Sequence, residues 1–195
     1  ISFEAIAVDM GLICRNVSLG LQTQATEKGI LLKVQTDSRI RNKVISDPTR
    51  MTQVISNLVH NAVKFTKTGG VELRLQLLTQ LDRAYRLRIE VEDTGIGIPS
   101  DKMALIFERF TQADSSTSRS FGGTGLGLSI AKRILELQNS KLELKSEVGK
   151  GSTFWFDIDL PVSTEKVDAP NTNSLLAQEL ADDSKQQLLA GANIL

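Results

Sequence analysis

The sequence predicts a two-layer α/β sandwich in which one mixed, mostly antiparallel β-sheet lies under three helices. Two long segments, Ile6–Lys28 and Pro48–Lys64, have apolar residues at helical spacing. Two later segments, Val71–Leu78 and Tyr85–Glu92, alternate between apolar and polar residues as strands do. A third helical pattern, Thr124–Leu137, precedes two more strand-like runs. Helices and strands that are interspersed along the chain in this way favour a fold with one layer of helices and one layer of strands.

The composition is that of an ordinary globular protein, with 41% hydrophobic residues. The 195 residues suffice for one domain and an appendage. Lys and Arg number 23, as do Asp and Glu, so nothing indicates a surface for nucleic acid or for an acidic membrane. The one cysteine, Cys14, excludes an internal disulfide and fits a reducing compartment. Because Cys14 lies in an apolar helical pattern, we expect it in the core.

No apolar run approaches the roughly 18 residues that a membrane span needs, and no signal peptide is recognisable. The chain begins without methionine and in the middle of a pattern. We therefore expect a fragment of a longer protein, with no membrane contact made by these residues.

The first half of the chain is expected to alternate strands and helices. A short strand begins near Phe3, and a helix follows that ends near Lys28-Gly29. This helix is predicted from apolar residues three or four positions apart: Ile6, Met10, Ile13, Val17 and Leu21. Strands are predicted at Ile30–Val34 and Lys43–Ser46. Asp47-Pro48 then gives a strong helix start, with a capping acceptor before a proline at the first helical position.

The helix Pro48–Lys64 is predicted to have two different faces. One face is apolar and consists of Met51, Ile55, Leu58, Val59 and Ala62. The other is a polar stripe of Gln53, Asn57, Asn61 and Lys64. Asparagine is a mediocre helix former, so two asparagines four residues apart favour a binding site. A solvated polar surface is the alternative explanation of the same stripe.

The second half is expected to begin with a hairpin, Val71–Leu78 and Tyr85–Glu92, and to continue with a short helix over Asp101–Phe107. The polar segment Thr111–Phe121 is expected to be a flexible lid. The third helix follows it, and the last two strands are predicted at Lys141–Ser146 and Ser152–Leu160. Residues 163–195 contain no aromatic residue and hold a Pro/Asn-rich breaker at Ala169–Asn173, so they are predicted to be a linker.

Two glycine-rich turns bracket residues 92–128. Asp93-Thr94-Gly95-Ile96-Gly97-Ile98-Pro99 follows a predicted strand, and Gly122-Gly123-Thr124-Gly125-Leu126-Gly127-Leu128 precedes a predicted helix. Glycine allows close backbone approach, and a helix N-terminus offers free N–H groups to an anion. The two turns therefore predict a nucleotide pocket with a mobile cover.

A third segment makes this pattern specific: Asn57-Leu58-Val59-His60-Asn61-Ala62-Val63-Lys64-Phe65-Thr66. With Phe107-Glu108-Arg109-Phe110, it completes an Asn box, a Gly box, a Phe box and a second Gly box in order. The chain thus resembles the ATP-binding catalytic domain of sensor histidine kinases, in the superfamily shared with gyrase, heat-shock chaperone and mismatch-repair ATPases. The resemblance covers roughly Ser2 to Pro161. It predicts a catalytic domain at residues 1–162 and a lid over ATP.

The resemblance also implies roles for individual residues. Asp93 accepts a hydrogen bond from the exocyclic amine of adenine, and Phe65 flanks the base. Asn61 is the magnesium ligand, and Lys64 reaches a phosphate. Arg109 and Arg119 are candidates for the lid side of the triphosphate, or else exposed loop residues. The implied ATP contacts are Asn57, Asn61, Lys64, Phe65, Asp93, Gly95, Gly97, Ile98, Phe110, Arg119, Gly123, Thr124, Gly125, Leu126, Gly127, Leu128 and Thr153, with Asn57, Asn61 and Lys64 as the catalytic set.

Asn57 separates two kinds of enzyme within this superfamily. In the hydrolysing relatives, a glutamate at this position activates water. An amide is not a general base, so attack by water is expected to be slow, while transfer of the γ-phosphoryl group to another nucleophile is unaffected. The residue therefore favours a kinase over an ATPase.

The resemblance implies two protein partners: a separate helical dimerisation domain that carries the phosphorylated histidine, and a response regulator or receiver domain. His60, the only histidine, lacks the His-Glu-x-x-x-Pro context, so we expect this chain to bind Mg-ATP without labelling itself. Ala192-Asn193-Ile194-Leu195 resembles the start of a receiver domain, which indicates a hybrid kinase. The expected location is the cytoplasm, or the cytoplasmic part of a membrane-bound sensor. The alternatives are a serine kinase or hydrolytic ATPase of this superfamily, and a non-catalytic docking module.

Overall fold

The computed structural model describes residues 4–103, 105–107 and 126–167. Its strands are β1 (Ile6–Val8), β2 (Leu31–Thr36), β3 (Asn42–Ser46), β4 (Gly70–Gln80), β5 (Ala84–Asp93), β6 (Glu143–Glu147) and β7 (Gly151–Lys166). Its α-helices are α1 (Met10–Glu27), α2 (Pro48–Phe65) and α3 (Gly127–Glu136), and two 3-10 turns are η1 (Ser100–Lys102) and η2 (Leu105–Phe107).

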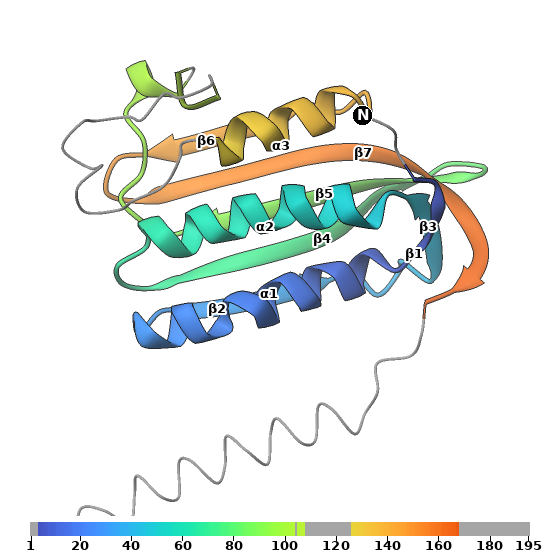
Figure 1. Ribbon diagram of the computed structural model, residues 1–195, viewed down its shortest axis with the longest axis horizontal. Helices are drawn as coiled ribbons and strands as arrows, with labels where there is room; N and C mark the ends of the chain where they lie inside the picture. Colours follow the sequence, from blue (N-terminus) through green and yellow to red (C-terminus); the bar gives the residue numbers. More distant parts are fainter. Residues whose placement is uncertain (1–3, 104, 108–125, 168–195) are drawn as a thin grey trace, which may run out of the picture.

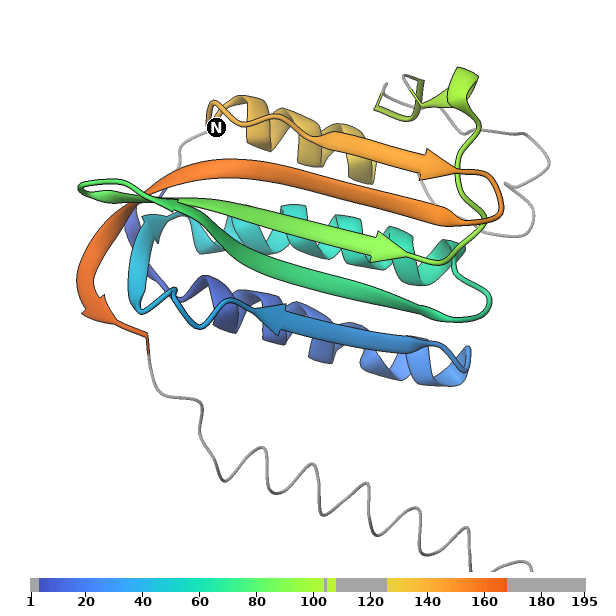
Figure 2. The same cartoon turned by 180° about the vertical axis from the view of Figure 1, so that it is seen from behind.

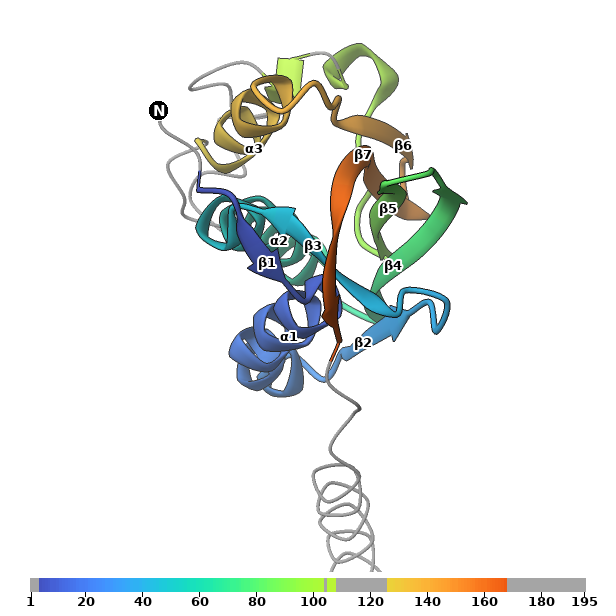
Figure 3. The ribbon, with the colours of Figure 1, turned by 90° about the vertical axis from the view of Figure 1, so that its right-hand side faces the viewer.

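The strands form one sheet in the order β1-β3-β7-β5-β4-β2, with β6 paired to β7. β2 and β4 are parallel, and the other described pairs are antiparallel. The three α-helices lie side by side over one face of the sheet (Figure 1), and the opposite face is open (Figure 2). Figure 3 shows the two layers from the side. The predicted two-layer sandwich with a mixed, mostly antiparallel sheet is confirmed.

The core lies between the helices and the sheet, with α2 at its centre. α2 packs against α1 and α3 and lies over β4 and β5. All five apolar residues predicted for its inner face are buried. The strands alternate as expected, and β5 directs Tyr85, Leu87, Ile89 and Val91 into the core. Cys14 is fully buried as predicted, and burial raises the pKa of its thiol to about 12.

Aspartate caps fix where the first two helices begin. The Asp47 carboxylate accepts hydrogen bonds from the N–H groups of Arg50, at 2.9 Å, and Glu4, at 3.0 Å, so α2 begins as predicted. Asp9 accepts from the N–H of Leu12 at 3.0 Å, which starts α1 at Met10. Ile6 was predicted to be in this helix but lies in β1, and Phe3, the predicted strand start, lies outside the described residues. None of the described helices is both long and apolar enough to cross a membrane.

Two later elements differ from the prediction. The short helix expected over Asp101–Phe107 is instead the two turns η1 and η2, on either side of residue 104, which lies outside the described part. β7 continues to Lys166, so the first four residues of the predicted linker, 163–166, belong to a strand. Lys43 of β3 holds this extension through an ion pair with Glu165 at 2.9 Å. The domain division and the linker from 168 onward remain predictions.

Charged pairs cover the open face of the sheet. Arg86 and Arg88 of β5 each bind an aspartate of β7, Asp159 and Asp157, with N–O distances of 2.7–2.8 Å. Arg74 of β4 binds Glu72, Glu90 and Glu92. Opposite charges across neighbouring strands stabilise a sheet modestly, by about 0.2–1 kcal/mol a pair. The outer face is thus polar.

Two glycines in the β6–β7 turn give a matched test of this packing. Gly149 and Gly151 both have positive φ, +80° and +109°. A Cβ at Gly151 would stand 1.9 Å from the carbonyl oxygen of Asp93, whereas one at Gly149 meets no atom within 4 Å. We expect Gly149→Ala to cost about 1–2 kcal/mol of unfolding free energy, because the backbone alone is strained. Gly151→Ala should cost clearly more. Denaturant unfolding measures both, and equal losses would contradict the close contact.

Candidate functional site

Asp93 marks the candidate site at the end of β5. Its side chain is on the core face of the sheet, only 7% exposed, and its Oδ1 accepts a hydrogen bond from the N–H of Gly95 at 2.8 Å. Burial raises the pKa of this carboxyl, the backbone N–H groups of Gly95 and Ser152 oppose the rise, and the charge of Glu92 adds to it. No ion pair joins Asp93 to another described residue, and a buried carboxylate of this kind is typical of functional sites.

The first glycine turn packs against the protein's own backbone. A Cβ at Gly95 would stand 2.6 Å from the carbonyl oxygen of Phe65, at the end of α2. A Cβ at Gly97, where φ is +67°, would stand 2.1 Å from the carbonyl oxygen of Glu147. Ile98 extends the contact, because its N–H donates to Ser146 Oγ at 2.8 Å. These glycines bring the ends of β5, α2 and β6 together.

The predicted polar stripe of α2 lies along one side of the helix. Gln53, Asn57, Asn61 and Lys64 are all half-buried, between the buried apolar face and the solvent. Asn57 Nδ2 donates to the carbonyl oxygen of Gly127 at 3.0 Å and so ties α2 to the first residue of α3. Asn61 makes no hydrogen bond to another described residue. Its amide oxygen therefore remains available for a ligand.

The second glycine turn is described only from Leu126 onward. Gly127 begins α3, Leu128 packs against the core, and Ser129 Oγ donates to the carbonyl oxygen of Leu126 at 2.9 Å. The described start of α3 is thus next to Asn57. The other predicted lid and turn contacts lie outside the described residues: Arg109, Phe110, Arg119, Gly123, Thr124 and Gly125.

The end of α2 carries Lys64 and Phe65. Lys64 Nζ lies 5.0 Å from the centre of the Phe65 ring, a cation–π distance. Lys28, just after α1, donates to the carbonyl oxygens of Val63 and Lys64 at 2.5 and 2.8 Å. Lys28 thereby caps the C-terminus of α2. His60 is exposed on the same helix, as expected for a residue outside the site.

The strand register shows on which face of the sheet Thr153, a predicted ATP contact, lies. Thr153 pairs with Glu92, and the alternation of β7 places it on the opposite face from the core residues Phe154 and Phe156. Asp93 pairs with Ser152, which is 7% exposed and on the core face. Ser152, which was not singled out from the sequence, therefore lies beside Asp93. Counting strand positions back from Phe154 would have found it.

The described residues contain no group of three or more His, Cys, Asp or Glu side chains that could hold a metal ion. Mg²⁺, however, prefers oxygen ligands and keeps several waters, so it needs few protein ligands. The half-buried, unpaired amide of Asn61 fits this donor chemistry.

Comparison with known proteins identifies the family. A family model described as "Histidine kinase-, DNA gyrase B-, and HSP90-like ATPase" matches residues 46–162, more than half of the chain. This chain belongs to that family. The match includes the asparagines of α2, both glycine turns and the end of the sheet that carries Asp93.

Its relatives are sensor kinases. The chain is 37% identical to the sensor histidine kinase AruS of Pseudomonas aeruginosa over 91% of its own length and 18% of AruS. It is 43% identical to the autoinducer 2 sensor kinase/phosphatase LuxQ of Vibrio cholerae over 74% of its length and 17% of LuxQ. The chain thus spans under a fifth of either relative.

Solved structures agree with the fold. Full-length ShkA in complex with AMPPNP matches with a TM-score of 0.72 at 33% identity, covering 84% of this chain and 32% of ShkA. The catalytic domain of the histidine kinase ThkA matches with a TM-score of 0.62 at 26% identity, covering 81% of this chain and 95% of that domain. The chain is therefore an ATP-binding catalytic domain of the histidine kinase type.

Asp93→Asn tests whether the buried charge serves binding. A group whose pKa is raised by folding stabilises the native state below its unfolded pKa, and this contribution is lost as the pH rises through the folded pKa. At neutral pH the burial of Asp93 therefore lowers the stability of the empty domain. We expect Asp93→Asn to leave the melting temperature at pH 7 unchanged or higher. ATP affinity should fall about tenfold or more, because a charged hydrogen-bond acceptor is lost.

Calorimetric titration with ATP and a melting curve of the same sample measure both effects. A large drop in melting temperature at pH 7 would instead show that the carboxylate is needed for folding.

Proposed function

We propose that this chain binds Mg-ATP and transfers the γ-phosphoryl group to a histidine on a separate dimerisation domain, as part of two-component signal transduction. The observation that carries the proposal is the position of Asp93. This buried carboxylate lies at the end of β5 that packs, through Gly95, against the end of α2. The half-buried Asn57 and Asn61 lie on that same helix. A purine acceptor and amide groups for the phosphates thus border one site.

The proposed roles follow from the chemistry of each side chain. Asp93 accepts a hydrogen bond from the amine of adenine, and Phe65 flanks the base. Asn61 holds Mg²⁺ through its amide oxygen, and the ion would neutralise charge on the phosphates. Lys64 lies one turn further and adds a positive charge. The AMPPNP complex of ShkA supports nucleotide binding by this fold.

Asn57 supports transfer to a protein rather than to water. Its Nδ2 is engaged by the Gly127 carbonyl oxygen, and an amide does not remove a proton from water. Phosphoryl transfer needs mainly positioning and charge stabilisation, which this geometry offers to an incoming nucleophile.

The partners and location belong to the same proposal. Both relatives are sensor kinases by name. This similarity supports two partners: a histidine-bearing dimerisation domain, and a response regulator or receiver domain. A cytoplasmic location, alone or as the cytoplasmic part of a membrane-bound sensor, follows from that role. A serine kinase, a hydrolytic ATPase and a non-catalytic docking module remain the competing functions that the experiments below distinguish.

Asn61→Ala tests the magnesium assignment, with His60→Ala as the matched control on the neighbouring position of α2. Asn61→Ala should abolish the part of ATP affinity that depends on Mg²⁺, because the proposed amide ligand is gone. His60→Ala should change nothing, since His60 is exposed. The measurement is calorimetric titration of ATP with and without Mg²⁺. An unchanged magnesium dependence in Asn61→Ala would remove this residue from the metal site.

Radiolabelled ATP tests the reaction itself. The chain alone should retain no label, because His60 is its only histidine and lacks the acceptor context. Added to a histidine kinase dimerisation domain, it should produce an acid-labile, base-stable phosphohistidine on that domain, with little free phosphate. Rapid phosphate release without transfer would favour a hydrolytic ATPase, acid-stable label a serine kinase, and no ATP binding a docking module.

A further inference from the structure

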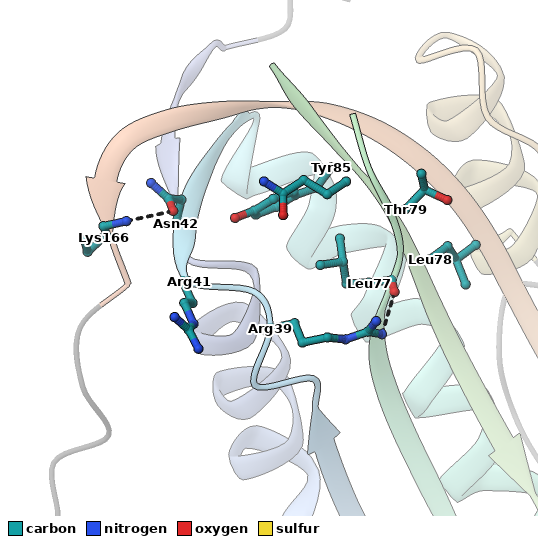
Figure 4. A pocket seen from close by; sticks show the side chains of 9 residues that line it. Arg39, Arg41, Asn42, Leu77, Leu78, Thr79, Tyr85 and Lys166 are labelled. Carbon is teal, nitrogen blue, oxygen red and sulfur yellow. Dashed lines mark hydrogen bonds between the residues drawn. The ribbon is translucent and has the colours of Figure 1, made fainter. Parts of the chain in front are cut away.

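A second pocket lies at the opposite end of the sheet from Asp93. It has a volume of about 410 Å³ and opens between the start of β3, the β4–β5 hairpin and the end of β7 (Figure 4). Tyr85, the second residue of β5, lines this pocket and lies eight residues before Asp93. At about 3.4 Å per strand residue, the two sites are about 27 Å apart. The nucleotide site and this pocket are therefore separate.

Two irregularities in the strand register shape the pocket. The pairing of β4 with β5 shifts between Leu77 and Thr79, and the pairing of β3 with β7 shifts between Asn42 and Val44. A bulge bends a strand and turns side chains away from their regular direction, and bulges are common next to binding sites. Thr79 and Asn42, which border these shifts, both line the pocket. Both pairs of strands have partners on each side of the shift, so the pocket lies beside irregular pairing within a continuous sheet.

The pocket has an excess of positive charge. Arg39 is neutralised by Asp37, with N–O distances of 2.6–3.1 Å, and this pairing holds the pKa of Asp37 well below its usual range. Arg41 and Lys166 pair with no carboxylate in the described part of the chain. Lys166 Nζ donates only to Asn42 Oδ1, at 3.2 Å. Two cations are therefore left for an anionic ligand.

The hydroxyl of Tyr85 points to the same conclusion. The residue is only 4% exposed, and its ring packs in the core. Figure 4 shows its hydroxyl directed toward β3, on the side of Asn42. The hydroxyl has no hydrogen-bond partner among the described residues. Tyr85 lines the pocket, and its hydroxyl is not one of the buried polar atoms that lack a partner among the described residues, so it is accessible to hydrogen-bond a ligand there.

We propose that this pocket binds a small organic oxyanion, a phosphorylated or polycarboxylate metabolite. Arg41 and Lys166 neutralise its charge, and Tyr85 donates a hydrogen bond to one of its oxygens. The concave shape and the volume fall in the range of small-molecule sites, about 300–1,000 Å³, and exceed what inorganic phosphate would fill. Lys166 is the last residue of β7, so the ligand would link the end of β7 to the β4–β5 hairpin.

The test is an amide NMR titration of the full chain with inorganic phosphate, glycerol 3-phosphate and citrate at constant ionic strength. We expect saturable shifts at Arg41, Tyr85 and Lys166, with one of the organic anions binding more tightly than inorganic phosphate. The preferred anion tells a phosphate ligand from a carboxylate ligand. Arg41→Gln and Lys166→Gln should each weaken that binding about tenfold or more. Lys33→Gln, which removes an exposed charge of β2, is the matched control and should change nothing.

Tyr85→Phe separates binding from folding. Because its hydroxyl has no described partner, its removal should leave the melting temperature unchanged and weaken anion binding several-fold. A lower melting temperature without ligand would show that the hydroxyl is structural. Shifts that do not saturate, shifts confined to the Asp93 end, or equal weakening by Lys33→Gln would each overturn the proposal.

Discussion

The structure depends on backbone segments that touch directly at the end of the sheet carrying Asp93. The start of β7 approaches the Asp93 carbonyl oxygen so closely that only a glycine, Gly151, fits. A Cβ at Gly95 would likewise clash with the end of α2, and one at Gly97 with the end of β6. Because no side chain separates these segments, their spacing is set by main-chain geometry. The buried carboxylate and the asparagines of α2 therefore hold fixed positions before any nucleotide binds.

Asp93 stands apart electrostatically from the other aspartates around it. Hydrogen bonds from backbone N–H groups outweigh burial and lower the pKa of Asp47, and Arg86 lowers that of Asp159. Among the described residues Asp93 pairs with no arginine, and burial raises its pKa. Backbone hydrogen bonds compensate the burial of Asp93 only in part, so this carboxyl carries a local energetic cost. Such exceptions to otherwise consistent sequences are expected at functional sites.

Local chemistry decided what the sequence could predict. The cap at Asp47, the two faces of α2 and the alternation of β5 each follow from neighbouring residues, and all were predictable. Ile6 was predicted to be helical because it lies four residues before Met10, a helical spacing. The structure places it in a strand because it pairs with β3 and because the cap at Asp9 starts the helix later. Thr153 was the residue named from the sequence, whereas its neighbour Ser152 is the residue that pairs with Asp93. Which of the two shares the face of Asp93 depends on the strand register, which the turn before β7 determines. The Tyr85 pocket was not predictable, because it lies where the β4–β5 hairpin meets β3 and β7, which are distant from it in the sequence.

The two ends of β5 differ in construction: one is built from glycines and main-chain contacts, the other from irregular strand pairing and long side chains. Between them, β5 pairs with β7 at every residue from Ala84 to Asp93, and its inward side chains are buried. Coupling between distant sites requires an element with two arrangements. A strand held on both sides offers no second arrangement. An anion bound at Tyr85 should therefore stabilise the end of β7 at Lys166 and leave the affinity for nucleotide unchanged.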